Sequence, residues 1–318
     1  MDRDLEELLS AVIGSDPHSK IDDKKRESLV FTMLGMVSTE KLEALCRFCD
    51  SISSVDIRSS LLNKVATKVP AIDFRRARRI ADSIPLPYWR FSAMIDIASQ
   101  LLQFDRQFDR RAGKTRSTFR EDAFNIIREV ENSIPQIPEE DGDRATIVWQ
   151  AGHVLVENGE LDWAEKLAAC DDYCPDRIDV LLRIARLRAS ETENTRAFQI
   201  ARHVADLACR SRDERQAISR AFDLSSAAEI AYGLGQRAAA RQYLDAALQL
   251  AVPNQHNDTD GVKCVAGLAI SLAQQGDFDA ALKVANEITI AARRDYALEK
   301  INELMAKVAP TQSAPQKQ

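Results

Sequence analysis

The sequence predicts an all-α protein in which about seven antiparallel helix pairs stack into an α-solenoid. Composition is the first observation: 45% of the residues are hydrophobic, only 6% are aromatic, and glycines (11) and prolines (10) are few. Helices that pack through small side chains have this composition. The second observation is that two apolar patterns with helical spacing alternate along the chain. The third is that matching positions recur at a fixed distance, which indicates a repeat protein.

An alanine anchors the second helix of each expected pair. It recurs in similar strings such as GDFDAALKVA (276–285) and GELDWAEKLA (159–168). The anchors are Ala44, Ala77, Ala123, Ala164, Ala197, Ala240 and Ala281. A short side chain at this place lets the two helices of a pair approach closely.

A second position marks the first helix of each pair. In six repeats it lies 12 residues before the anchor, at Thr32, Val65, Gly152, Ala185, Ala228 and Ala269. Only the third repeat departs, with 25 residues from Ala98 to Ala123. The basic period of 33 residues predicts a helix, a tight turn and a second helix in every repeat, with insertions at some junctions.

Glycine and proline support these boundaries. Gly159, Gly235 and Gly276 fall in the expected turns, where a residue with positive φ is wanted. We expect all the prolines to lie in junctions or tails, because a proline inside a helix removes a backbone hydrogen bond. The turns and junctions therefore divide the chain where the spacing predicts.

The two ends of the array differ from the repeats. We expect residues 3–13 to form an N-terminal capping helix within the segment 1–23, and residues 293–307 to form a C-terminal one, since the apolar ends of a solenoid need covers. The repeat array itself spans residues 24–307. The last residues, 308–318, have no apolar period, and we expect a disordered tail.

The string LAQQGDFDAALKVANEI (272–288) resembles a tetratricopeptide repeat, whose helix pair has a Gly-Asp-aromatic turn followed by alanine at helical spacing. The resemblance covers about residues 24–307 and is strongest at 265–288 and 149–168. The chain departs from the family in its period of 33 rather than 34 and in Ala285, where a bulky aromatic residue is usual. The resemblance implies a right-handed superhelix that serves as a protein-binding scaffold, without cofactor or chemistry of its own.

The stretch FDRRAGKT (108–115) ends in the letters of a phosphate-binding P-loop. A P-loop needs a glycine five residues before its Gly-Lys-Thr and a strand before the loop. Phe108 takes the place of that glycine, and the preceding residues have helical spacing. We therefore interpret residues 105–120 as a loop inserted between the two helices of the third repeat.

The expected loop is basic within a protein of net charge −6. Its basic residues include Arg106, Arg110, Arg111, Lys114 and Arg116. Arginine clusters suit acidic or phosphorylated partners, but a solvated loop has the same composition, and both interpretations stay open. The net charge gives no general attraction to nucleic acid, which we do not expect as the partner.

Polar and aromatic side chains gather at the inner positions of repeats four to six. In stacked helix pairs the first helices line a concave groove, and the residue after each small position faces it. This rule selects His153, Arg186 and Glu229, with Trp149 and Tyr232 about one turn away. We expect these residues to contact a peptide or helix of a partner protein. Packing of the two aromatic side chains between repeats is the alternative.

No residue pattern nominates a catalytic or metal site. The four histidines lack zinc-protease spacing, and no Gly-x-Ser-x-Gly elbow occurs. Cys46 and Cys49, like Cys170 and Cys174, have spacings that zinc sites use, but the two pairs are far apart in an array whose repeats touch only neighbours. We place Cys46 and Cys49 on the outward side of their helix, where a thiol redox role and a structural role both stay open. We expect no cofactor and no metal.

The sequence therefore predicts a non-catalytic adaptor that docks another protein in its groove, with the oligomeric state left open. Two alternatives remain: a helical-repeat enzyme with an unrecognised active site, and binding of a polyanion or phosphoprotein through residues 105–120. The acidic N-terminus lacks the pattern of a signal peptide, and no apolar run has the length of a membrane span. We expect a cytoplasmic protein without a membrane partner.

Overall fold

A computed structural model describes residues 42–50, 52–112, 118–138, 142–255 and 259–308. In these ranges the chain forms α-helices, short 3-10 helices and turns, and no strand. The all-α fold class is confirmed. Within the same ranges, no helix combines the length and the apolar composition needed to cross a bilayer. The predicted helix 3–13 lies outside the described residues, and so does the predicted tail except Val308, which is the last residue of a helix.

The chain divides into two compact units, residues 1–154 and 155–318, which we call the N-terminal and the C-terminal unit. The described helices of the N-terminal unit are α3 (Leu42–Asp50), α4 (Val55–Lys68), η2 (Ala71–Asp73), α5 (Phe74–Asp82), α6 (Pro87–Ala112), α7 (Thr118–Ser133), η3 (Ile134–Gln136) and α8 (Asp143–Glu157). The division between the two units falls near the end of α8. The C-terminal unit continues with α9 (Leu161–Ala168), α10 (Pro175–Ser190), α11 (Asn194–Arg210), η4 (Glu214–Gln216), α12 (Ala217–Gly233), α13 (Arg237–Asn254), α14 (Thr259–Gln274), α15 (Phe278–Asn286) and α16 (Ala291–Val308).

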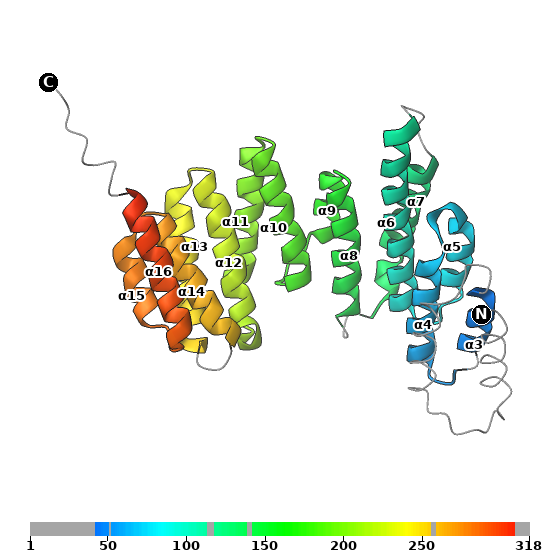
Figure 1. Cartoon of the computed structure of the whole chain (residues 1–318), viewed down its shortest axis with the longest axis horizontal. Helices are drawn as coiled ribbons and strands as arrows, with labels where there is room; N and C mark the ends of the chain where they lie inside the picture. Colours follow the sequence, from blue (N-terminus) through cyan, green and yellow to red (C-terminus); the bar gives the residue numbers. More distant parts are fainter. Residues whose placement is uncertain (1–41, 51, 113–117, 139–141, 256–258, 309–318) are drawn as a thin grey trace. The chain divides into compact units, whose positions relative to one another are not determined.

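Within each unit, neighbouring helices pack in the same alternating way (Figure 1). In the C-terminal unit α10 packs on both α11 and α12, α12 on α13 and α14, and α14 on α15 and α16. In the N-terminal unit α4 packs on α5 and α6, and α6 on α7. A first helix thus contacts its own partner and the next first helix, as in stacked helix pairs.

The core contains the positions that the spacing selected. Each described anchor is at most 1% exposed: Ala77, Ala123, Ala164, Ala197, Ala240 and Ala281. The marked residues of the first helices are also buried: Val65, Ala98, Gly152, Ala185, Ala228 and Ala269. The predicted helical spacing is therefore confirmed at these positions. Thr32 and the side chain of Ala44 lie outside the described residues.

The turn inside a pair has one recurring geometry. Gly159, Gly235 and Gly276 have φ of 79°, 77° and 85°, as expected for a left-handed residue at a helix end. The amide after the glycine closes the turn, for example from Asp277 N–H to the Leu272 carbonyl at 3.0 Å. Thr192 occupies the same place between α10 and α11 with φ 69°. Because no atom crowds the space where a Cβ would be added to these glycines, only the backbone conformation favours glycine there.

The predicted loop over residues 105–120 is wrong at both ends. Residues up to Ala112 continue α6, and α7 begins at Thr118. No glycine or proline interrupts the chain between Pro87 and Gly113, so residues 105–112 lengthen the helix instead of belonging to a loop. Phe104 of α6 packs edge to face on Phe119 of α7, with ring centroids 5.1 Å apart.

The expectation that no proline enters a helix is wrong at two positions. Pro253 lies inside the last turn of α13, and Pro135 lies in the short helix η3. Pro253 precedes the last helical residue, so few backbone bonds remain to be lost. Pro87 and Pro175 begin α6 and α10, where a proline is well tolerated because its missing N–H has no helical partner.

Candidate functional site

A groove that contains predicted binding residues lies on α10 and α12 of the C-terminal unit. It encloses about 420 Å³. The residues that line it are Arg186, Ala189, Asn194, Glu229, Ile230, Gly233 and Leu234. Two residues predicted from the sequence, Arg186 and Glu229, are among them.

Helix packing places these two charges in the groove. Each follows a fully buried alanine, Ala185 or Ala228, which packs against the neighbouring helices. One residue further along a helix turns the side chain by about 100°, so the next position leaves the core. Arg186 and Glu229 accordingly keep 49% and 54% of their side chains exposed.

The two charges face each other without forming a tight ion pair. The closest atoms, Arg186 Nη2 and Glu229 Oε2, are 4.0 Å apart. Such an exposed contact contributes little to stability, since solvent screens it. Beside it, Ile230 is 6% exposed and Ala189 and Leu234 are half-buried. The groove thus offers a cation, an anion and an apolar floor to a partner.

Tyr232 lies on the same helix as Glu229 but is not among the lining residues. It is half-buried, and its carbonyl accepts the Gly235 amide at 2.9 Å in the turn that ends α12. A contact of its ring with a partner stays a prediction.

Trp149 and His153 belong to α8 in the N-terminal unit. Their rings are in contact, with centroids 4.7 Å apart and planes tilted by 57°. Trp149 is 37% exposed, and His153 is half-buried. The structure brings these two residues together, as it does Arg186 and Glu229, but in different units. That all five form one surface stays a prediction.

A half-buried pair that sequence reasoning missed lies close to Arg186. The Tyr173 hydroxyl, in the connection between α9 and α10, donates to Asp223 Oδ2 of α12 at 2.5 Å. The pKa of Asp223 is raised to about 6, mainly by burial and to a smaller extent by nearby Asp179, while the Tyr173 hydrogen bond and Arg186 offset part of the rise. Burial and the adjacent carboxylate also raise the pKa of Tyr173. Because the two residues are 50 positions apart in the sequence, no local signal pairs them.

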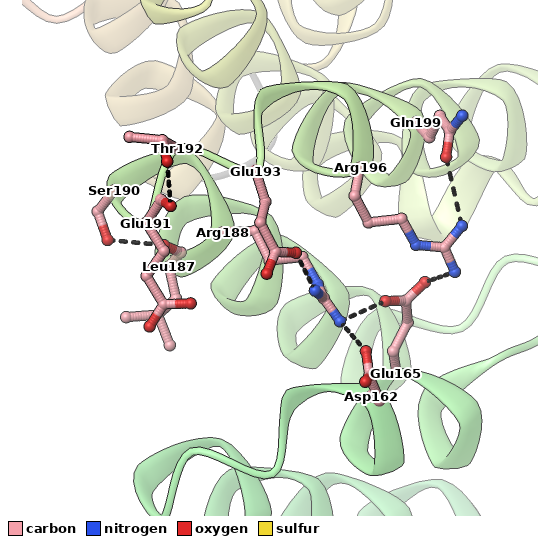
Figure 2. A network of polar contacts seen from close by, with 10 residues as sticks. All are labelled: Asp162, Glu165, Leu187, Arg188, Ser190, Glu191, Thr192, Glu193, Arg196 and Gln199. Atoms are coloured by element: carbon pink, nitrogen blue, oxygen red, sulfur yellow. Dashed lines mark hydrogen bonds and ion pairs between the residues drawn. The ribbon is translucent and has the colours of Figure 1, made fainter.

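A second polar network, shown in Figure 2, centres on Arg188 at the end of α10. Arg188 is only 6% exposed, and its guanidinium contacts Asp162 and Glu165 of α9 and Glu193 before α11. Glu165 also pairs with Arg196 of α11. Three consecutive helices are therefore tied together by one buried cation. No local sequence pattern predicts this network, because Asp162 and Glu165 belong to a different helix from Arg188.

The basic residues of the predicted loop are placed only in part. Arg106, Arg110 and Arg111 lie on the last turns of α6, and Arg106 is exposed. Lys114 and Arg116 lie outside the described residues. These residues are therefore carried by a helix where the structure describes them, and whether they bind a partner stays a prediction.

The cysteines differ from the prediction at one position. Cys46 is half-buried, but Cys49 is fully buried, so its placement on the outward side of α3 is wrong. Burial raises the pKa of Cys49 to about 12, which keeps its thiol protonated and unreactive. Cys170 and Cys174 are half-buried in the connection before α10. In the described part of the chain, no three His, Cys, Asp or Glu side chains are grouped as metal ligands would be.

Comparisons with known proteins add little to this geometry. No family model matches the chain, and no curated protein matches it significantly. Among solved structures, the crystal structure of Ton1535 from Thermococcus onnurineus NA1 aligns over 93% of this chain and 94% of that chain, with 14% identity and a TM-score of 0.26. A TM-score this low carries no argument about fold or function.

Proposed function

We propose that the protein is a tetratricopeptide-like, right-handed α-solenoid of about seven helix pairs that serves as a non-catalytic adaptor. The proposal is supported by the alternation of buried small residues, by the recurring glycine turns, and by the packing of each first helix on the next within a unit. Proteins of this architecture present the inner faces of their first helices to a partner.

The groove on α10 and α12 docks a peptide or helix of another protein. The observation that carries this proposal is the loose contact of Arg186 with Glu229, at 4.0 Å, beside an apolar floor. A partner that supplies an acidic and a basic side chain replaces this weak contact by two better ones, while its apolar side chains cover Ile230 and Leu234. Removing water from the exposed part of that floor adds to the affinity.

Affinity capture with quantitative mass spectrometry tests this function. The bait is the full chain, and the variant is Arg186→Ala with Glu229→Ala. We expect the captured partner to fall by about tenfold, because two side chains near the centre of an interface typically carry more than 1 kcal/mol.

The matched control changes a similar pair on another helix. Arg202 and Asp206 of α11 are also 4.0 Å apart and exposed, so Arg202→Ala with Asp206→Ala removes the same chemistry outside the groove. Capture that survives in the control and is lost in the groove variant supports the proposal. Equal capture by both variants and the wild type contradicts it.

A further inference from the structure

Positive charge is concentrated in one stretch of this acidic protein. Residues 58–128 contain 15 Lys and Arg but only 7 Asp and Glu, although the whole chain has a net charge of −6. Twelve of the 15 are arginine. The stretch runs from α4 to α7, all in the N-terminal unit. Because a guanidinium offers a planar fork of donors, arginine is suited to binding carboxylates in pairs of hydrogen bonds.

Part of this charge is used inside the fold. Arg78 of α5 pairs with Asp82 at 2.9 Å and with Glu129 of α7 at 2.5 Å. Arg58 and Arg90 donate to backbone carbonyls near helix ends. These three side chains hold neighbouring helices and are not free to bind a partner.

Arg120 and Arg128 are also exposed, and they contact Phe124 and Asn125 of their own helix. The other exposed cations in the described part of the stretch are Lys68, Arg75, Arg79 and Arg106. No ion pair to any of them occurs among the described residues. Arg75 and Arg79 are four residues apart on α5 and therefore share one face of that helix. Between Lys68 and Arg75 lies Ile72, which is 73% exposed.

Helix packing gathers these residues at one end of the N-terminal unit. The Gln100 amide of α6 donates to the Thr67 carbonyl at 2.7 Å, so α6 passes the end of α4 near Gln100. It then continues to Ala112, and Arg106 lies about 9 Å further along its axis. The segment η2, which contains Ile72, also packs against α6. Figure 1 shows α6 and α7 extending past α5 at this end.

We propose that this basic end, defined by Lys68, Ile72, Arg75, Arg79 and Arg106, docks an acidic peptide segment of a partner protein. The cations bind glutamate or aspartate side chains of the segment, and one apolar side chain of the segment packs on Ile72. The site lies in a different unit from the groove on α10 and α12, and it does not depend on that groove.

Two observations favour a peptide over a nucleic acid. The first is Ile72, because an exposed isoleucine gains nothing from a phosphate backbone but can pack against an apolar side chain of a peptide. In the described part of residues 58–128, no aromatic side chain is exposed to stack on bases.

Fluorescence anisotropy on the full chain tests the proposal. The probe is a short labelled peptide in which glutamates flank two leucines, and its partner probe has glutamine in place of glutamate. We expect the glutamate peptide to bind and the glutamine peptide to bind at least about tenfold more weakly. Raising the salt concentration from about 50 to about 300 mM should weaken binding of the glutamate peptide, because a shorter Debye length screens its attraction to the cations.

Variants locate the site. Arg75→Glu with Arg79→Glu should weaken binding of the glutamate peptide at least about tenfold. Ile72→Ser should weaken its binding by about threefold to tenfold. Arg212→Glu with Arg237→Glu changes the net charge equally at exposed positions of the C-terminal unit and should leave binding unchanged. Circular dichroism of each variant verifies that the helices persist.

Three results would overturn the proposal. The first is failure of the glutamate peptide to bind, or equal binding of the glutamine peptide. The second is equal weakening by the control pair in the C-terminal unit, which would show a general charge effect. The third is tighter binding of a short duplex DNA than of the peptide, with no change in DNA binding on Ile72→Ser.

Discussion

Asp223 is a carboxyl group whose ionisation works against the fold. Burial raises its pKa from 3.8 to about 6, so the folded state binds this proton more tightly than the unfolded chain does. The protonated form therefore contributes to the free energy of unfolding. This contribution is complete below about pH 4 and is lost as the pH rises through 6. The Tyr173 hydrogen bond and Arg186 offset part of the cost of the charged form.

Asp223→Asn should remove this dependence on pH. Between pH 4 and 7 we expect the free energy of unfolding of the wild type to fall by about 3 kcal/mol relative to that of the variant, because about two pKa units separate the two states. Urea unfolding at several pH values measures it. Glu229→Gln, at an exposed carboxylate, is the control and should follow the wild type. Parallel curves for wild type and Asp223→Asn would contradict the account of Asp223.

Thr192 holds a backbone conformation that its side chain disfavours. With φ at 69° it takes the position that glycine takes in three equivalent turns. Thr192→Gly should stabilise the protein by about 0.5–1 kcal/mol, since the left-handed strain exceeds the entropy that glycine costs. Thermal melting measures this, with Thr195→Gly in the first turn of α11 as the control that should not raise the melting temperature, because Thr195 is helical and has no left-handed strain to relieve. An unchanged or lower melting temperature for Thr192→Gly would refute it.

At the scale of the elements, Arg188 links α9, α10 and α11 through its contacts with Asp162, Glu165 and Glu193. Arg188→Ala should lower the free energy of unfolding by about 1.5–3 kcal/mol, because Glu165, only 14% exposed, loses one of its two cations and keeps only Arg196. Arg186→Ala, two residues away and half exposed, should change it by less than about 0.5 kcal/mol. Similar midpoints for the two variants in a denaturant titration would show that the network is dispensable.

The elements themselves were largely predictable, because small residues at fixed spacing must be buried where two helices approach. The end of α6 is also predictable, because no glycine or proline precedes Gly113 after Pro87, and the predicted loop is wrong because it takes an insertion in the repeat for an interruption of the helix. At the site, Arg186 and Glu229 could be found by their position after a buried alanine. Tyr173 with Asp223 and the role of Arg188 could not, because both depend on contacts between helices that no local pattern records.

At the scale of the whole molecule, the two candidate surfaces differ in chemistry as well as in place. The groove of the C-terminal unit offers opposite charges and an apolar floor, whereas the end of α4, α5 and α6 offers an excess of positive charge. An adaptor with two such surfaces engages two segments of one partner or one segment of each of two partners. Binding at the two surfaces should depend differently on salt concentration, because only the second surface is dominated by charges of one sign.

Site-specific photocrosslinking tests the central claim, partner docking in the groove, most directly. A photoreactive amino acid replaces Gly233, which is exposed in the groove, or Gln242, which is exposed on α13. The account predicts that the protein recovered by affinity capture crosslinks from position 233 and not from position 242. Crosslinks from 242 with none from 233 would contradict it.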